Sequence, residues 1–298
     1  MSTEALRRWK LSTRRLRQVL LGWAAIVALI ALWQTLTYSG AVAIAAEWQF
    51  DRFGRYFPAL TLIVLAALFG SPVLFLLRRR PRRHDDPGVA LAIAAERQAC
   101  LLLRILLWLA GGFCLAALVA LALVLFLPAT TGAPLRVTVG APGSISPDEG
   151  PTRLVGAVQY DRTSAFDGNL LLFRRSFRFA PVQPIGRPSS DLRYFIELGP
   201  DEHIAPVSAE RTGILRRGSL PGEIIRLYRY AGYELTKPHY VLYQSRTSMR
   251  WPYYVTAAHL AFVALVLGLA SAFQYGRWRK IRRQAADREA AVPIAAPE

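Results

Sequence analysis

Histidine is the side chain of this sequence best suited to proton transfer or metal binding, and the chain has four of them. His259 stands inside a long apolar run, where an ionisable group is costly and often serves a function. It could handle a proton or a substrate, or it could make a contact between helices. Haem iron usually needs a second axial ligand, and no other apolar run contains a histidine, which argues against haem. His259 is therefore the candidate functional residue inside the membrane.

Other arrangements of reactive side chains give weaker signals. Asp201-Glu202-His203 brings three potential metal ligands together, but consecutive side chains point in different directions, and no second group has zinc-ligand spacing. A Ser-His-Asp triad can be assembled from distant residues, but no G-x-S-x-G motif supports one. The sequence also lacks a phosphate-binding glycine loop and a Cys-x-x-Cys pair. We expect no catalytic residue, no metal and no cofactor, and the sequence favours a protein that is not an enzyme, without excluding one.

Several long apolar runs occur along the chain, and the most informative one is Ile105–Leu127, which contains no charge. At about 1.5 Å per residue, a helix over this run would span roughly 35 Å, enough to cross a bilayer core of about 30 Å. A soluble helix of this length would keep one polar face. Four transmembrane helices are expected, at about residues 19–38, 57–77, 101–127 and 253–276.

Arginine and lysine residues flank these runs in a consistent pattern. Segments 1–17, 78–99 and 277–298 carry six basic residues each, whereas the loop 39–56 has no net charge. Because basic segments are retained in the cytoplasm, both termini are expected inside and segment 129–252 outside. The net charge of +17 would also suit nucleic acid. Its position beside the apolar runs instead predicts a multi-pass protein of the bacterial cytoplasmic (inner) membrane, in contact with anionic headgroups, with a periplasmic domain and no nucleic-acid partner.

Segment 129–252 has the mixed composition of one small domain inserted between the third and fourth helices. Strands are predicted where apolar residues alternate, at 135–139, 153–160, 170–179, 192–198 and 240–243. Asp167-Gly168-Asn169 predicts the turn of a hairpin. Pro221 and Glu223 suit the start of a helix over about 221–231, and Gly232 suits its end. The expected fold is α+β, with one helix on a mainly antiparallel β-sheet or small barrel.

Three arginines of one expected strand form a candidate contact surface. Arg174, Arg175 and Arg178 lie close together in the sequence. They could contact lipid headgroups or an anionic partner. They could equally form a solvated face of the sheet.

Small residues recur every four positions in two of the expected membrane helices. Such rows let the backbones of two helices approach closely. One row is in the third helix, at Gly112, Ala116 and Ala120, and the other is in the fourth, at Ala264, Gly268, Ala272 and Gly276. The two helices could pack against each other through these rows, or a row could receive a helix of another membrane protein.

These observations favour a non-catalytic accessory, assembly or scaffold protein that acts through its periplasmic domain and its helix packing. A periplasmic ligand-binding or sensory membrane protein is the first alternative, although no cytoplasmic signalling domain is visible. A membrane enzyme or transporter component that uses His259 is the second alternative. Few polar groups lie in the apolar runs, which makes a poor translocation path. The expected partners are the bilayer and another membrane protein or complex, and the oligomeric state is left open.

Overall fold

The chain is described by a computed structural model over residues 3–76, 87–128, 130–141, 144, 146–170, 173–186, 191–199 and 208–290. It divides into two compact units, each with its own contacts. We call them the helical unit and the sheet unit. The helical unit comprises Met1–Trp33, Ala45–Leu118 and His259–Glu298. The sheet unit comprises Gln34–Ile44 and Val119–Ala258.

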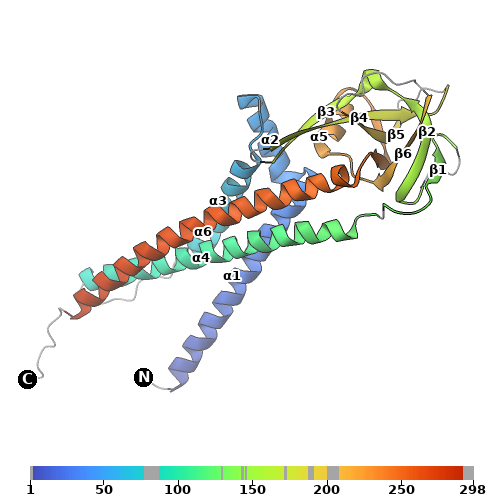
Figure 1. Ribbon diagram of the computed structural model, residues 1–298. Helices are drawn as coiled ribbons and strands as arrows, with labels where there is room; N and C mark the ends of the chain where they lie inside the picture. Colours follow the sequence, from blue (N-terminus) through green and yellow to red (C-terminus); the bar gives the residue numbers. More distant parts are fainter. Residues whose placement is uncertain are drawn as a thin grey trace, which may run out of the picture. The chain divides into compact units, whose positions relative to one another are not determined.

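Five long helices account for the apolar runs (Figure 1). They are α1 (Thr3–Thr37), α2 (Gly40–Phe53), α3 (Pro58–Leu76), α4 (Pro87–Leu123) and α6 (Arg246–Ala290). Among the described residues, three helical stretches are long and apolar enough to cross a membrane: Leu20–Thr37, Ala94–Phe126 and Arg246–Asp287. The apolar stretch of α3, Pro58–Gly70, is shorter than the span expected over 57–77. Three of the four expected helices therefore have membrane length in the described part of the chain.

Helix α2 replaces the loop that was expected over residues 39–56. The segment is rich in alanine, which has the highest helix propensity. Two residues with positive φ, Tyr38 (46°) and Gly40 (59°), make the sharp turn that separates α2 from α1. Gly54 follows the last turn of α2 with φ 67° and donates its N–H to the carbonyl of Phe50 at 2.8 Å. A left-handed glycine at this position is a common way to end a helix.

Side-chain hydrogen bonds join helices within the helical unit. Trp23 Nε1 of α1 donates to the carbonyl of Phe69 in α3 at 2.8 Å. Gln49 Nε2 of α2 donates to Thr61 Oγ1 of α3 at 2.9 Å, and both side chains are buried. Bonds of this kind hold apolar helices in register, because a polar group in a lipid-like environment needs a partner.

Seven strands form one mixed sheet in the sheet unit. They are β1 (Leu135–Thr138), β2 (Gly150–Val158), β3 (Ser164–Leu170), β4 (Phe173–Gln183), β5 (Asp191–Leu198), β6 (Ser208–Arg217) and β7 (Glu234–Tyr243). The strand order is β1-β2-β6-β7-β5-β4-β3, and β2 pairs with β4 as well. This extra pairing closes β2, β6, β7, β5 and β4 into a small barrel. The pairs β1–β2 and β5–β7 are parallel, and the other pairs are antiparallel.

Two apolar cores lie on opposite faces of the barrel wall. The core inside the barrel includes Leu154, Val182, Tyr194, Leu215 and Tyr240. The core outside it packs beneath helix α5 (Gly222–Tyr230) and includes Phe179, Phe195, Ile224, Tyr228 and Tyr243. Because successive side chains of a strand point to opposite faces, one strand supplies both cores. The helix expected over 221–231 is confirmed as α5, and Ile224 and Tyr228 are its buried residues.

Two details of the expected strands are wrong. Asp167, Gly168 and Asn169 do not form the hairpin turn, because they pair within β3 with Ser176, Arg175 and Arg174 of β4. The alternation over 192–198 would put Leu192 on the same face as Tyr194, but the two residues belong to different cores, and the register between β5 and β7 shifts between them. Leu192 therefore joins the core outside the barrel, whereas Tyr194 points inside. An irregularity of this kind cannot be predicted from the alternation of apolar residues.

Candidate functional sites

The small residues of α4 are packed inside the chain. A Cβ atom added to Gly112 would lie 2.9 Å from the carbonyl oxygen of Ala24, which belongs to α1. The backbones of α4 and α1 therefore approach more closely here than any larger residue would allow. Ala116 and Ala120, which continue the row, are buried as well. This row is occupied by the chain itself.

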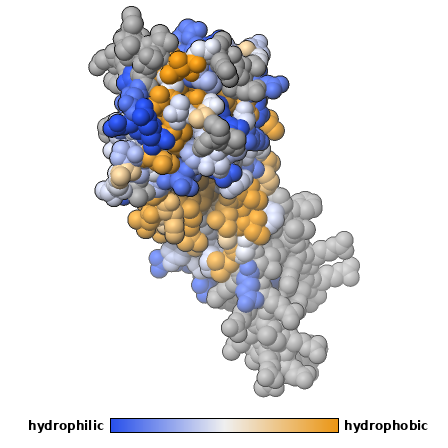
Figure 2. All heavy atoms as spheres, turned by 90° about the vertical axis from the view of Figure 1, so that its right-hand side faces the viewer, coloured by the Kyte–Doolittle hydropathy of each residue, from blue (hydrophilic) through white to orange (hydrophobic). Residues whose placement is uncertain are grey.

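The small residues of α6 have a different environment. A Cβ atom added to Gly268 or Gly276 would meet no neighbouring atom within 4 Å among the described residues. Ala272 is exposed, Ala264 is partly exposed, and apolar side chains beside the row are exposed too, with Phe273 at 77%. Figure 2 shows apolar side chains gathered in a band on one face of the molecule. This part of α6 is an open apolar surface, which we call the α6 row.

His259 belongs to the opposite, buried side of α6. It is only 3% exposed, and other polar residues of α6, Thr256, Ser271 and Gln274, are buried with it. Gln274 Nε2 donates to the carbonyl of Ala99 in α4 at 3.3 Å, and Ser271 donates to Leu267 of its own helix. His259 also takes part in an interaction within the chain. Its position on a face that makes helix contacts is the arrangement expected of a packing residue.

The three candidate arginines are only partly described. The side chains of Arg174 and Arg175 lie outside the described residues, and only their backbones are placed, in β4. Arg178 is partly buried and takes part in an interaction within the chain. Arg175 pairs with Gly168 of β3 and Arg178 with Ala165 of β3 and Leu198 of β5.

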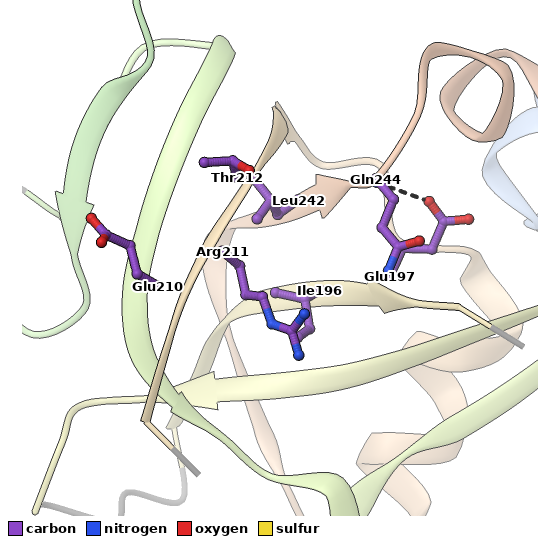
Figure 3. Close-up of a pocket in the computed structure, with 7 residues that line it drawn as sticks. All are labelled: Ile196, Glu197, Glu210, Arg211, Thr212, Leu242 and Gln244. Atoms are coloured by element: carbon purple, nitrogen blue, oxygen red, sulfur yellow. Dashed lines mark hydrogen bonds between the residues drawn. The ribbon is translucent and has the colours of Figure 1, made fainter. Parts of the chain in front are cut away.

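A pocket of about 250 Å³ opens beside the end of β7 (Figure 3). Residues of β5, β6 and β7 line it, together with the residue that follows β7: Ile196, Glu197, Glu210, Arg211, Thr212, Leu242 and Gln244. Arg211 pairs with Leu154, so its side chain starts on the inner face of the barrel. In the sequence, the sign of this pocket residue is a single arginine at an inward-facing position of β6, shortly before Gly213 and Leu215.

The charged groups of this pocket are held by the chain itself. Arg211 Nη2 donates to the hydroxyl of Tyr160 at 2.9 Å. The backbone N–H of Gln244 donates to Glu197 Oε2 at 3.1 Å, which is the dashed line in Figure 3. Glu210 is turned away from the other lining residues. Its Oε1 lies 3.7 Å from Arg136 Nε and 3.6 Å from Arg153 Nε. These contacts fix the side chains of Arg211 and Glu197, so the pocket contains one positive and one negative group.

No group of three or more His, Cys, Asp or Glu residues that could hold a metal ion occurs among the residues that the structure describes. Asp201-Glu202-His203 lies outside the described residues. Cys100 and Cys114, both in α4, are free thiols.

The fold and these surfaces define a class: a chain whose helices are long and apolar enough to span a membrane, with a mixed seven-stranded sheet domain. No family model matches the chain, and no curated protein or solved structure is similar to it.

Proposed function

We propose that this protein is a non-catalytic accessory, assembly or scaffold protein of a membrane, and that a helix of another membrane protein packs on the α6 row. The observation that carries the proposal is the contrast between the two small-residue rows. The space beside Gly112 in α4 is occupied by α1, whereas a Cβ atom added to Gly268 or Gly276 would meet no neighbouring atom within 4 Å among the described residues. In a bilayer, close backbone approach is a main source of helix association.

The sheet domain supports the same proposal. Its barrel interior is filled by side chains, and Tyr194 and Tyr240 stack there with ring centroids 5.5 Å apart. A barrel that holds a ligand needs an open interior. The charged groups at the mouth of the barrel are already engaged with the chain. A folded domain of this type presents its outer surface to partners, not its interior.

Substitution of Gly268 by leucine is expected to weaken partner association by about tenfold or more, because a bulky side chain would separate the two helix backbones. The measurement is quantitative recovery of co-purified membrane proteins from mild detergent, with wild type and variant labelled differently. Gly111→Leu is the matched control, since a Cβ atom added to Gly111 would also meet no neighbouring atom within 4 Å among the described residues, but Gly111 lies on α4. Equal recovery with Gly268→Leu and Gly111→Leu, or no reproducible partner of wild type, would contradict the proposal.

The proposed topology places both termini in the cytoplasm and the sheet domain outside, in the periplasm of a bacterium. Within the sheet unit, Tyr38 at the end of α1 contacts Gly222 at the start of α5. This contact supports the topology, because it requires the α1–α2 turn and the inserted domain to lie on the same side of the bilayer. The arginine distribution gives the direction.

Cysteine labelling is expected to separate the two sides of the membrane. In a background with Cys100→Ser and Cys114→Ser, a cysteine at Tyr230, which is 94% exposed, should react with a membrane-impermeant maleimide in cells with an opened outer membrane. A cysteine at Gln284, exposed near the end of α6, should react only after the inner membrane is permeabilised. Labelling of position 284 before that step would show that the orientation is reversed.

A further inference from the structure

Helix α6 carries aromatic side chains on both sides of its mainly apolar stretch, residues 255–273. Tyr254 precedes this stretch, and Tyr275 and Trp278 follow it. From Tyr254 to Tyr275 the helix is about 31 Å long, close to the thickness of a bilayer core of about 30 Å. Tyrosine and tryptophan are enriched where a helix meets the two surfaces of a membrane. The spacing therefore predicts that Tyr275 and Trp278 lie at one membrane surface.

Helix α4 packs against α6 at this end, and the two helices lie side by side (Figure 1). Gln274 Nε2 of α6 donates to the carbonyl of Ala99 in α4 at 3.3 Å. About two turns further along α6, Arg282 Nε lies 3.9 Å from Glu96 Oε1 of α4. The guanidinium carbon of Arg282 also lies 5.4 Å from the centre of the Trp278 ring. Arg282 is therefore engaged by the chain itself.

Three further cations lie on the side of α6 that faces away from α4. Arg279, Lys280 and Arg283 are exposed, whereas Gln274 and Ala285 are buried. On an α-helix, the three positions are centred roughly opposite to Gln274, which contacts α4. Arg279 and Arg283 are one turn apart, and like charges at this spacing repel each other. An anion bound between them would remove this repulsion. We call these three residues the α6 cation cluster.

We propose that the α6 cation cluster binds the headgroup phosphate of an anionic phospholipid in the membrane that α6 crosses. The cluster begins one residue beyond Trp278, so the phosphates of the bilayer lie at its depth. Guanidinium and ammonium groups both form charge-assisted hydrogen bonds with phosphate oxygens. Each cation near an anionic membrane surface raises the affinity about fivefold, so three raise it by at most on the order of 10²-fold.

This lipid site rests on the membrane crossing proposed above, but it does not require a partner on the α6 row. The row ends at Gly276, and the α6 cation cluster lies beyond it. Gly268, in the middle of the row, is about 16 Å along the helix from Arg279. A partner helix on the row and a phospholipid on the cluster therefore use different residues.

Binding of phosphatidylglycerol to the full chain in a neutral detergent tests the site, with bound lipid counted by native mass spectrometry. Phosphatidylcholine, whose headgroup has no net charge, is the reference lipid. We expect wild type to bind phosphatidylglycerol about tenfold or more tightly than phosphatidylcholine. The triple variant Arg279→Gln, Lys280→Gln and Arg283→Gln should lose this preference. In wild type the preference should also fall as salt is added, because salt screens exposed charges. That result does not depend on the folding of any variant.

The matched control removes three exposed cations of the sheet domain, in the triple variant Arg217→Gln, Arg229→Gln and Lys237→Gln. It changes the net charge of the chain by the same amount and should keep the wild-type preference for phosphatidylglycerol. Gly268→Leu should keep it too. The measurement therefore separates failure of the lipid site from failure of the proposed partner on the α6 row.

The lipid site would be overturned by any of three outcomes. Wild type could bind the two lipids equally well, or keep its preference unchanged at high salt. The two triple variants could lose the preference to the same extent, which would report net charge and not a site. Inorganic phosphate, added at the same concentration as phosphatidylglycerol, could displace the lipid, which would show that the cluster binds a free anion.

Discussion

Replacing Tyr194 with alanine is expected to lower the free energy of unfolding of the sheet domain by about 3–5 kcal/mol, the cost of deleting a large aromatic side chain from a core. Tyr194 is 1% exposed and lies inside the barrel. Its ring stacks on that of Tyr240 at an interplanar angle of 18°. A closed barrel cannot collapse easily around the resulting cavity, because hydrogen bonds between strands hold its wall at a fixed radius.

The matched control for this prediction is Tyr194→Phe. It keeps the ring and removes only the hydroxyl, which donates to the backbone carbonyl of Ser144. Its expected cost is about 1–3 kcal/mol, because the carbonyl is left without this donor. Near-ultraviolet circular dichroism of the full chain in detergent, followed through thermal unfolding, measures both variants. An equal loss in the two variants would show that the hydroxyl, and not the filled barrel, provides the stability.

Most strands and the single helix of the domain could be predicted because their signals are local, whereas β3 and β6 were not among the expected strands. Leu154 and Val158 alternate with polar or small residues along β2, and Pro221 precedes α5 as a helix start should. The three membrane-length helices were predictable for the same reason, since length and hydropathy are properties of a continuous run. Local signals therefore give the elements and the faces of most strands.

Closure of the barrel depends on contacts that the sequence does not display. Val158 of β2 pairs with Val182 of β4, and three partner strands for one strand cannot be inferred from its apolar pattern. The register shift beside Tyr194 and the position of the β3–β4 connection are equally invisible. These features result from competition among whole strands for partners, in which single residues contribute little.

In the candidate sites, too, local patterns could be predicted, whereas contacts between distant residues could not. The two rows of small residues were predictable from their spacing, but their difference was not, because it depends on where α1 lies against Gly112. The contact between Tyr38 and Gly222 could not be predicted, because the two residues are far apart in the sequence and neither is unusual alone.

Replacing Gly213 with valine is expected to reduce the free energy of unfolding of the sheet domain by about 3 kcal/mol or more, at the upper end of the range for overpacking. Gly213 lies in β6, and a Cβ atom there would be 2.5 Å from the carbonyl oxygen of Tyr243, the last residue of β7. Backbone cannot move aside as a side chain can, so β6 and β7 would have to separate where Ile214 pairs with Tyr243.

Thr212→Val is the matched control for this second prediction, because Thr212 is the exposed neighbour of Gly213 on the same strand and changes little in volume. It should shift the unfolding midpoint by only a small amount, since exposed substitutions cost within about 0.5 kcal/mol. Thermal unfolding of the full chain in detergent compares the two variants. A Gly213→Val protein as stable as Thr212→Val would mean that β6 and β7 are not pressed together at this point.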